Sequence, residues 1–185
     1  MRFLNLILII FLSLTISIKA ESNQNIIDEL ERGGKLIFIR HAYAPGNGDP
    51  ENFNLNDCLT QRNLSERGRM QARKIGAFIK KNQIPIDKIL SSEWCRCKET
   101  SSLAFGEYET KSFLNSFYSM KFSKNKDGQI SELKRYIDKW NSDKNLILIT
   151  HYVMISEILD YTSTSGEMII SDRQFNKIGN IKIKY

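Results

Sequence analysis

The chain contains two histidines, His41 and His151, and each follows directly after a short apolar run. Arg40 precedes the first histidine, and Arg96 follows a third apolar run. A neutral imidazole is a competent nucleophile near physiological pH, and an arginine presents a fixed fork of donors that matches phosphate oxygens. Two arginines and a second imidazole can bind three phosphate oxygens and stabilise the charge of the transition state. These residue types predict phosphoryl transfer through a phosphoenzyme, with His41 as the nucleophile.

A scaffold is needed that brings these distant positions to one place. Short apolar runs predict buried strands at Lys35–Ile39, Asp87–Ser91 and Asn145–Thr150. Residues with helical spacing lie between and after these strands, which predicts a three-layer α/β/α fold with a mostly parallel central sheet. Ligands bind beyond the carboxyl ends of the strands in such sheets, so we expect both histidines and both arginines to meet there.

Local signals place the helices and the last strand. Ser65 is predicted to cap a helix that ends before Pro85, and a second helix is predicted over Trp94–Ala104. Helical periods also run over residues 130–140 and 155–159. The alternation of Ile181, Ile183 and Tyr185 with lysines predicts a half-exposed strand at the end of the chain. Residues 44–62, rich in Gly, Asn, Asp and Pro, are expected to form a long loop.

The first twenty residues are predicted to be an export signal, followed by one domain over residues 21–185. Arg2 gives a positive start, Phe3–Ile18 is an apolar run, and Ala20 offers a small residue for cleavage. The alternative is an uncleaved membrane anchor, although the run has 16 positions, four of them polar, and a span needs about 20 apolar residues. We therefore expect a periplasmic or secreted protein whose membrane contact is limited to an uncleaved signal.

The charge and the cysteines limit the classes of partner. The net charge of +6 falls to +4 when the signal removes Arg2 and Lys19, and the remaining lysines are scattered, which argues against nucleic-acid binding. Cys58 can pair with Cys95 or Cys97 in an exported protein, or all three can be buried thiols. The sequence has no CxxC or HxxxH pattern, so we expect neither a metal nor another cofactor.

Three segments resemble the histidine phosphatase superfamily, which has the phosphoglycerate mutase-like fold. Arg40-His41-Ala42 resembles the Arg-His-Gly signature of the family, with Ala42 in place of glycine. The segment from Ser91 through Arg96 to Thr100 resembles the second-arginine segment, and Ile149–His151 resembles the second-histidine segment. The order and spacing agree from Lys35 to Leu159, and the segment from Asp57 to Ser65 also resembles a loop of exported bacterial members.

The resemblance assigns a role to each of these residues. It implies that His41 accepts the phosphoryl group and that Arg40, Arg96 and His151 complete the phosphate pocket. Arg62 and Asn63 are further candidates for contact with the substrate or its phosphate. For Arg62, the alternative is a surface arginine that precedes a helix.

One residue departs from the family pattern. Many members carry a glutamate after a Leu-Asn pair as the general acid, but Leu114-Asn115 is followed here by Ser116. A serine hydroxyl cannot serve as that acid near neutral pH. Another carboxylate can reach the site from a loop, with Asp57 and Glu109 as candidates. Otherwise the substrate has a good leaving group, or the protein is slow or only binds phosphorylated ligands.

The sequence thus predicts an exported, metal-independent phosphoric monoester hydrolase. The expected substrate is a phosphorylated small molecule or an envelope glycan. One alternative is a non-catalytic module of the same fold that binds phosphate ligands, and another is a structural domain with incidental histidines. The presence of His41 favours the enzyme, because a pure binding site has no need of a nucleophile.

Overall fold

The computed structural model describes residues 24–185, whose centre is a six-stranded sheet in the order β3-β2-β4-β1-β5-β6. Four of its strands pair in parallel: β1 (Leu36–Arg40), β2 (Ile86–Ser91), β3 (Glu109–Thr110) and β4 (Asn145–Thr150). Two strands continue the sheet beyond β1 in antiparallel pairing: β5 (Glu167–Ser171) and β6 (Lys177–Lys182). The mostly parallel sheet is as predicted.

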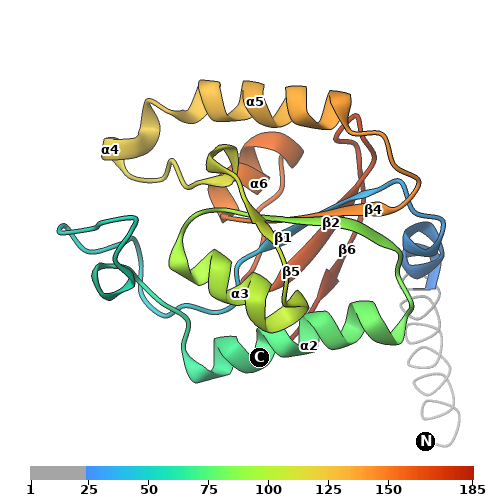
Figure 1. The fold of residues 1–185 in the computed structure, drawn as a ribbon, viewed down its shortest axis with the longest axis horizontal. Helices are drawn as coiled ribbons and strands as arrows, with labels where there is room; N and C mark the ends of the chain where they lie inside the picture. Colours follow the sequence, from blue (N-terminus) through green and yellow to red (C-terminus); the bar gives the residue numbers. More distant parts are fainter. Residues whose placement is uncertain (1–23) are drawn as a thin grey trace, which may run out of the picture.

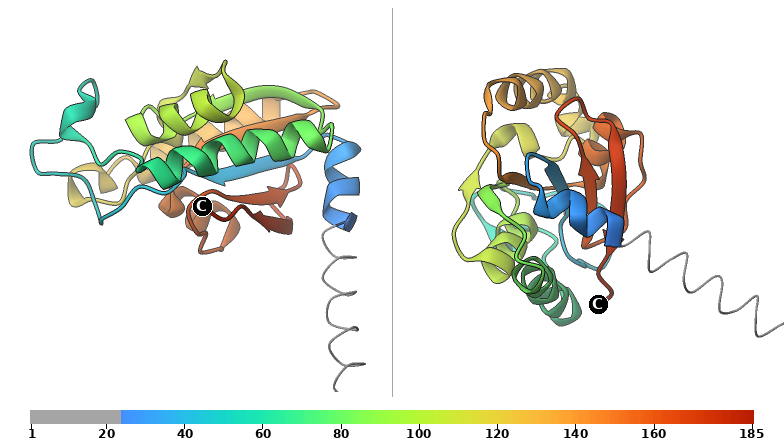
Figure 2. Two further views of the ribbon diagram at one scale, coloured as in Figure 1. Left: turned by 90° about the horizontal axis from the view of Figure 1, so that it is seen from below. Right: turned by 90° about the vertical axis from the view of Figure 1, so that its right-hand side faces the viewer.

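Helices cover both faces of this sheet, as Figures 1 and 2 show. One face carries α2 (Glu66–Lys81), α3 (Cys95–Phe105) and the helical residues 24–31. The opposite face carries α5 (Lys126–Lys139) and α6 (Tyr152–Leu159). The predicted three-layer α/β/α architecture is therefore confirmed.

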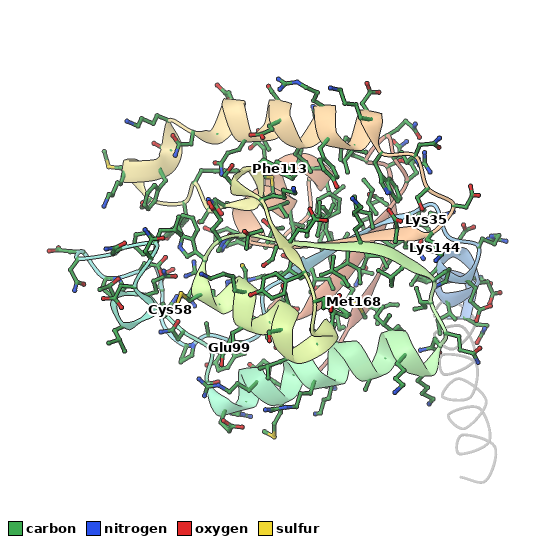
Figure 3. All side chains as sticks on the ribbon, viewed as in Figure 1. Lys35, Cys58, Glu99, Phe113, Lys144 and Met168 are labelled. Atoms are coloured by element: carbon green, nitrogen blue, oxygen red, sulfur yellow. A yellow bond between two sulfur atoms is a disulfide. The ribbon has the colours of Figure 1, made fainter. Side chains whose placement is uncertain are left out.

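Strand β1 is apolar from Leu36 to Ile39 because both of its faces are buried. Leu36 and Phe38 pack on the α5 and α6 side, whereas Ile37 and Ile39 pack on the α2 and α3 side. Figure 3 shows side chains filling both spaces, with Phe113 above the sheet and Met168 below it. Each fully buried side chain of this size contributes roughly 1.5–3 kcal/mol, so the central strands are anchored firmly. Their ends are consequently fixed points on which a site can be built.

The first turn of α2 is held against the chain that leaves the site. Ser65 caps α2, as predicted, and its hydroxyl accepts a hydrogen bond from the Gly68 N–H at 3.2 Å. Gly68 packs directly on the backbone of Tyr43, where an added Cβ would lie 2.0 Å from the carbonyl oxygen. This close approach fixes the two residues that follow His41.

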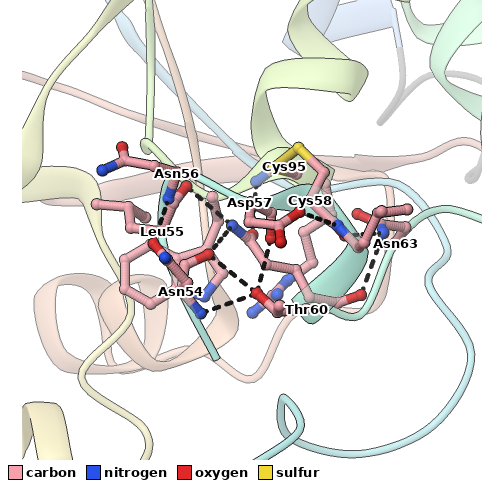
Figure 4. Close-up of a disulfide and its surroundings, with 12 residues drawn as sticks. Asn54, Leu55, Asn56, Asp57, Cys58, Thr60, Asn63 and Cys95 are labelled. Carbon is pink, nitrogen blue, oxygen red and sulfur yellow. Dashed lines mark hydrogen bonds between the residues drawn. A yellow bond between two sulfur atoms is a disulfide. The ribbon is translucent and has the colours of Figure 1, made fainter. Parts of the chain in front are cut away.

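Short elements surround the carboxyl ends of the parallel strands. They are η1 (Cys58–Thr60), η2 (Ser112–Leu114) and α4 (Met120–Ser123). The loop over residues 44–62, cyan in Figure 1, and α4 extend at the same end of the molecule. A disulfide joins Cys58 in this loop to Cys95 at the start of α3 (Figure 4). Cys97 is a buried free thiol. The structure thus selects one of the pairings that the sequence left open.

Within residues 24–185, no helix has the length and apolar character required to cross a membrane. The predicted export signal over residues 1–20 lies outside the described residues.

Candidate active site

His41 stands directly after β1 and is 2% exposed. Its backbone N–H donates to the Thr150 carbonyl of β4 at 3.0 Å. The ring Nδ1 lies 2.8 Å from the Ala42 carbonyl oxygen, which can only accept, so Nδ1 carries the proton. Burial, followed by the charge of Arg96, holds the pKa of His41 well below its ordinary value. The imidazole is therefore neutral, with its free lone pair on Nε2, which is the form required of a nucleophile.

His151 follows β4 and lies beside His41, with 5.5 Å between the ring centroids. Its Nε2 is 2.9 Å from the Ser92 hydroxyl, which in turn donates to Oδ1 of Asn115 at 3.0 Å. Because the Ser92 proton is used in that bond, His151 Nε2 is the donor to Ser92. Burial and then the charge of Arg96 hold the pKa of His151 well below its ordinary value as well. The second imidazole is also neutral and is fixed in orientation.

The orientation of Asn115 rests on its own partners. Its Oδ1 accepts from the backbone N–H of Glu93 at 2.9 Å, and its Nδ2 donates to the Glu93 carboxylate at 2.6 Å. These bonds distinguish the amide oxygen from the nitrogen. They therefore fix the direction of the chain of bonds from His151 through Ser92.

Arg96 enters the site from the first turn of α3, and its side chain is 4% exposed. Its Nη2 lies 3.4 Å from Nδ1 of His151, and its two terminal nitrogens donate to the carboxylate of Asp49 at 2.7 and 3.2 Å. Thr100, one turn further along α3, donates to the Arg96 carbonyl at 2.7 Å and accepts from the Ala42 N–H at 3.0 Å. The helix that carries Arg96 is thereby held against the segment that carries His41.

Arg40 and Arg62 complete a group of three guanidinium ions. Arg40 donates to the Ser163 carbonyl at 2.7 Å, and Arg62 donates through its Nε to the Gly48 carbonyl at 2.8 Å. Burial lowers the pKa of both arginines, although not into a range in which they lose their charge at neutral pH. Within the described residues, Nε of Arg40 and Nε of Arg96 are buried without a partner, so both side chains hold unused donors.

These groups line one cavity of about 360 Å³. The polar side of the cavity carries Arg40, His41, Arg62, Arg96 and His151. Its remaining wall is partly aromatic, formed by Phe53, Trp94, Tyr118, Phe122 and Tyr152. The structure therefore brings together the two histidines and all three arginines that the sequence indicated for the site.

Asn63 is not brought to this cavity. Its side-chain amide donates to the Cys58 carbonyl at 2.6 Å and to the Gln61 carbonyl at 3.1 Å, and the residue lines a separate shallow hollow next to the disulfide. Arg62 lines the cavity, where its guanidinium donates to the Gly48 carbonyl of the 44–62 loop. The next residue, Asn63, instead donates to backbone carbonyls around η1.

The two carboxylates suggested as replacement acids also lie elsewhere. Asp57 caps η1 by accepting from the Leu59 N–H at 3.0 Å. Glu109 lies on the edge strand β3 and pairs with Lys111 at 3.1 Å. Ser116 does line the cavity, and its hydroxyl accepts from the Tyr118 N–H at 3.3 Å.

Two residues of the site were not identified from the sequence. Asp49, which binds Arg96, comes from the irregular 44–62 loop, and no periodicity marks it. Ser92 belongs to the second-arginine segment, but its bond to His151 spans 59 residues of sequence and depends on the pairing of β2 with β4. Within the described residues, no cluster of three or more His, Cys, Asp or Glu side chains is arranged to hold a metal ion.

Comparison with known proteins identifies the family of the chain. A family model described as histidine phosphatase superfamily (branch 1) matches residues 36–140, which is more than half of the chain. No curated protein matches the sequence significantly.

Among solved structures, the protein histidine phosphatase SixA complexed with tungstate superposes with a TM-score of 0.55 at 14% identity, covering 81% of this chain and 96% of that one. A putative phosphohistidine phosphatase SixA from Agrobacterium tumefaciens gives 0.55 at 16% identity, with 80% and 98% covered. A phosphoglycerate mutase from Thermus thermophilus gives 0.54 at 14% identity, with 81% and 99% covered. At these identities the solved structures establish the fold alone, and the family model shows that the chain belongs to the histidine phosphatase superfamily (branch 1).

Proposed function

We propose that the protein hydrolyses phosphate monoesters through a phosphohistidine on His41, without a metal ion. One observation carries this proposal: a neutral His41, protonated on Nδ1, lines a cavity together with three guanidinium groups. The nucleophilic nitrogen and the phosphate clamp are thus present in the same cavity.

The proposed reaction has two steps. Nε2 of His41 forms a bond to phosphorus while the bond from phosphorus to the leaving oxygen breaks, and that oxygen takes up a proton. The ring gains positive charge as this bond forms, and the Ala42 carbonyl, which accepts from Nδ1, stabilises it. Water then attacks the phosphohistidine, the P–N bond breaks, and phosphate leaves neutral His41.

The arginines supply the electrostatic part of catalysis in this proposal. Arg40, Arg62 and Arg96 face an oxyanion with charges that do not titrate, and His151 lies against Arg96 through Nδ1. Most of the catalysis of phosphoryl transfer comes from positioning and from such charge stabilisation. The SixA structure contains tungstate, a tetrahedral oxyanion like phosphate, which supports oxyanion binding by a protein of this fold.

We further propose that the protein acts outside the cytoplasm, with residues 1–20 as its export signal. The Cys58–Cys95 disulfide supports this location, because disulfides persist in oxidising compartments. The proposed substrate is a phosphorylated small molecule or envelope glycan. The aromatic side of the cavity suits a ligand with an apolar face beyond its phosphate.

Hydrolysis of an aryl phosphate by the full-length protein, with chelator present, tests the proposal. An aryl phosphate has a good leaving group, so its turnover requires the nucleophile and the clamp but little protonation. We expect turnover in the wild-type protein and none in His41→Ala, with both proteins equally folded by circular dichroism. A folded wild-type protein that binds inorganic phosphate but shows no turnover would instead identify a phosphate-binding module.

A further inference from the structure

The active site lacks a general acid at the expected position. Ser116 lines the cavity with a hydroxyl, which cannot protonate a leaving oxygen near neutral pH. A general acid contributes typically about 10²–10⁴-fold, and this contribution matters most for poor leaving groups such as alkoxides. A replacement acid must therefore come from another carboxylate that lines the cavity.

Two carboxylates in the described part of the chain line the cavity, Asp49 and Glu51. Glu51 is exposed on the outer part of the 44–62 loop. Asp49 has a side chain that is 16% exposed, and it contacts Arg96, the guanidinium that also reaches His151. Of the two, Asp49 is the carboxylate in direct contact with the phosphate clamp.

The Asp49 carboxylate is held by four donors. Oδ1 accepts from Arg96 Nη1 at 2.7 Å and from the Arg62 N–H at 3.1 Å. Oδ2 accepts from Arg96 Nη2 at 3.2 Å and from the Trp94 indole at 3.1 Å. This set of bonds fixes the carboxylate against both terminal nitrogens of Arg96.

We propose that Asp49 is the general acid and base of this active site, replacing the acid that Ser116 cannot supply. This inference rests on the proposed phosphatase function.

The same contacts explain how Asp49 changes its protonation during the reaction. Burial alone raises the pKa of Asp49, but the Arg96 charge and the donated hydrogen bonds outweigh it and leave the pKa below the ordinary value. A bound phosphate competes for the Arg96 donors and places like charge beside the carboxylate, and both changes raise the pKa of Asp49. Since the second pKa of a phosphate ester is about 6, a substrate bound as the monoanion can also bring the proton with it.

The proton balance of the cycle closes on Asp49. In the first step, the protonated Asp49 gives its proton to the leaving oxygen as His41 Nε2 bonds to phosphorus. In the second step, the Asp49 carboxylate takes a proton from the attacking water as the P–N bond breaks. The products are the free alcohol and phosphate, and Asp49 gives up its proton again when phosphate leaves and the carboxylate pairs with Arg96 as before.

The test compares an alkyl phosphate, glycerol phosphate, with the aryl substrate p-nitrophenyl phosphate, using full-length variants. We expect Asp49→Asn to lose about 10²–10⁴-fold in kcat on glycerol phosphate and under about tenfold on p-nitrophenyl phosphate. The wild-type kcat on glycerol phosphate should decline as the pH rises through the pKa of Asp49 in the substrate complex, and this decline should be absent in Asp49→Asn.

Three further variants support the comparison. Asp57→Asn is the matched control, because it makes the same substitution in the same loop outside the cavity. Glu51→Gln removes the other carboxylate of the cavity, and we expect its ratio of aryl to alkyl rates to equal that of the wild type. Asp49→Glu retains an acid, so it should keep more of the alkyl activity than Asp49→Asn, including in a case where the asparagine variant melts early.

The possible results separate this inference from the proposed function. An equal loss on both substrates would show that Asp49 only orients Arg96 and would overturn the assignment. Tighter binding of inorganic phosphate by Asp49→Asn, with undiminished alkyl turnover, would identify the carboxylate as a competitor for the clamp. A selective alkyl loss in Glu51→Gln alone would move the acid role to Glu51. In this comparison, the proposed function fails when the wild-type protein turns over neither substrate.

Discussion

Breaking the Cys58–Cys95 disulfide is expected to destabilise the protein and to loosen the active site together. The bond closes a loop with a sequence separation of 37 residues. The loss of chain entropy for a loop of this length, 2.1 plus 1.5R ln 37 in cal/mol/K, corresponds to about 4 kcal/mol at 25 °C. In a domain of this size each kcal/mol shifts Tm by about 2–4 °C, so reduction should lower Tm by roughly 8–16 °C.

The position of this disulfide links stability to function. Cys95 precedes Arg96, and the Cys95 N–H also donates to the side chain of Gln61 at 2.9 Å. The loop that the bond ties down carries Asp49 and Arg62, both of which line the cavity. We therefore expect kcat/KM for an aryl phosphate to fall on reduction at temperatures where the reduced protein remains folded.

Thermal unfolding with and without reductant measures the effect. The Cys58→Ser/Cys95→Ser double variant is the control, since its Tm should equal that of the reduced wild type and should not respond to reductant. The third cysteine, Cys97, is buried and burial raises its pKa to about 12, so it is expected to be inert in this assay. A Tm shift below about 2 °C on complete reduction would show that the disulfide does not stabilise the fold by this amount.

Three further predictions follow from burial, packing and the donor set of the site. The pKa values of His41 and His151 are lowered in the folded state, so the unfolded chain binds more protons below about pH 6.5. The free energy of unfolding should therefore fall on acidification, by at most about 1.4 kcal/mol per pH unit for each histidine. Denaturant unfolding at pH 7 and pH 5 measures this change. Gly76→Ala should destabilise α2, because its Cβ would lie 1.9 Å from the Ala104 carbonyl oxygen. Gly128→Ala in α5 meets open space and should stabilise the protein by about 0.5–1 kcal/mol. Equal Tm changes for the two variants would contradict this prediction. Aryl phosphate turnover should persist in excess chelator because guanidinium groups provide the positive charge, and restoration of lost turnover by an added divalent ion would be evidence against that role.

The central elements could be predicted because their sequence patterns report burial directly. The apolar runs of β1 and β4 mark strands covered on both faces, and the Ser65 cap marks the start of α2. Once these strands are parallel, the residues after them meet at one edge, which is why His41 and His151 could be placed together.

The antiparallel end of the sheet was harder to predict. Strand β5 was not anticipated, and the alternation of Ile181, Ile183 and Tyr185 predicted a strand that runs to the end of the chain. Strand β6 instead ends at Lys182, where it pairs with Glu167 at the first residue of β5. Tyr185 leaves the sheet and stacks on Tyr43 with 4.5 Å between the ring centroids. Tertiary pairing, which alternation alone does not contain, sets this boundary.

The loop side of the active site was beyond sequence reasoning for a similar reason. Asp49 and Arg96 are 47 residues apart, and their contact depends on the path of an irregular loop held by the disulfide. Asn63, expected near the phosphate, turns instead to the backbone around η1. Irregular segments carry no periodic signal, so side chains on them can be placed only when the surrounding packing is known.

Trapping of the phosphoenzyme tests whether His41 is the nucleophile. The full-length protein is mixed with an aryl phosphate, quenched in alkali within the first turnovers, digested, and mapped by mass spectrometry. We expect a phosphoryl group on His41 that is stable in alkali, labile in acid, and absent from His41→Ala. Steady turnover with no phosphorylated residue, or with the phosphoryl group on any residue other than His41, would contradict it.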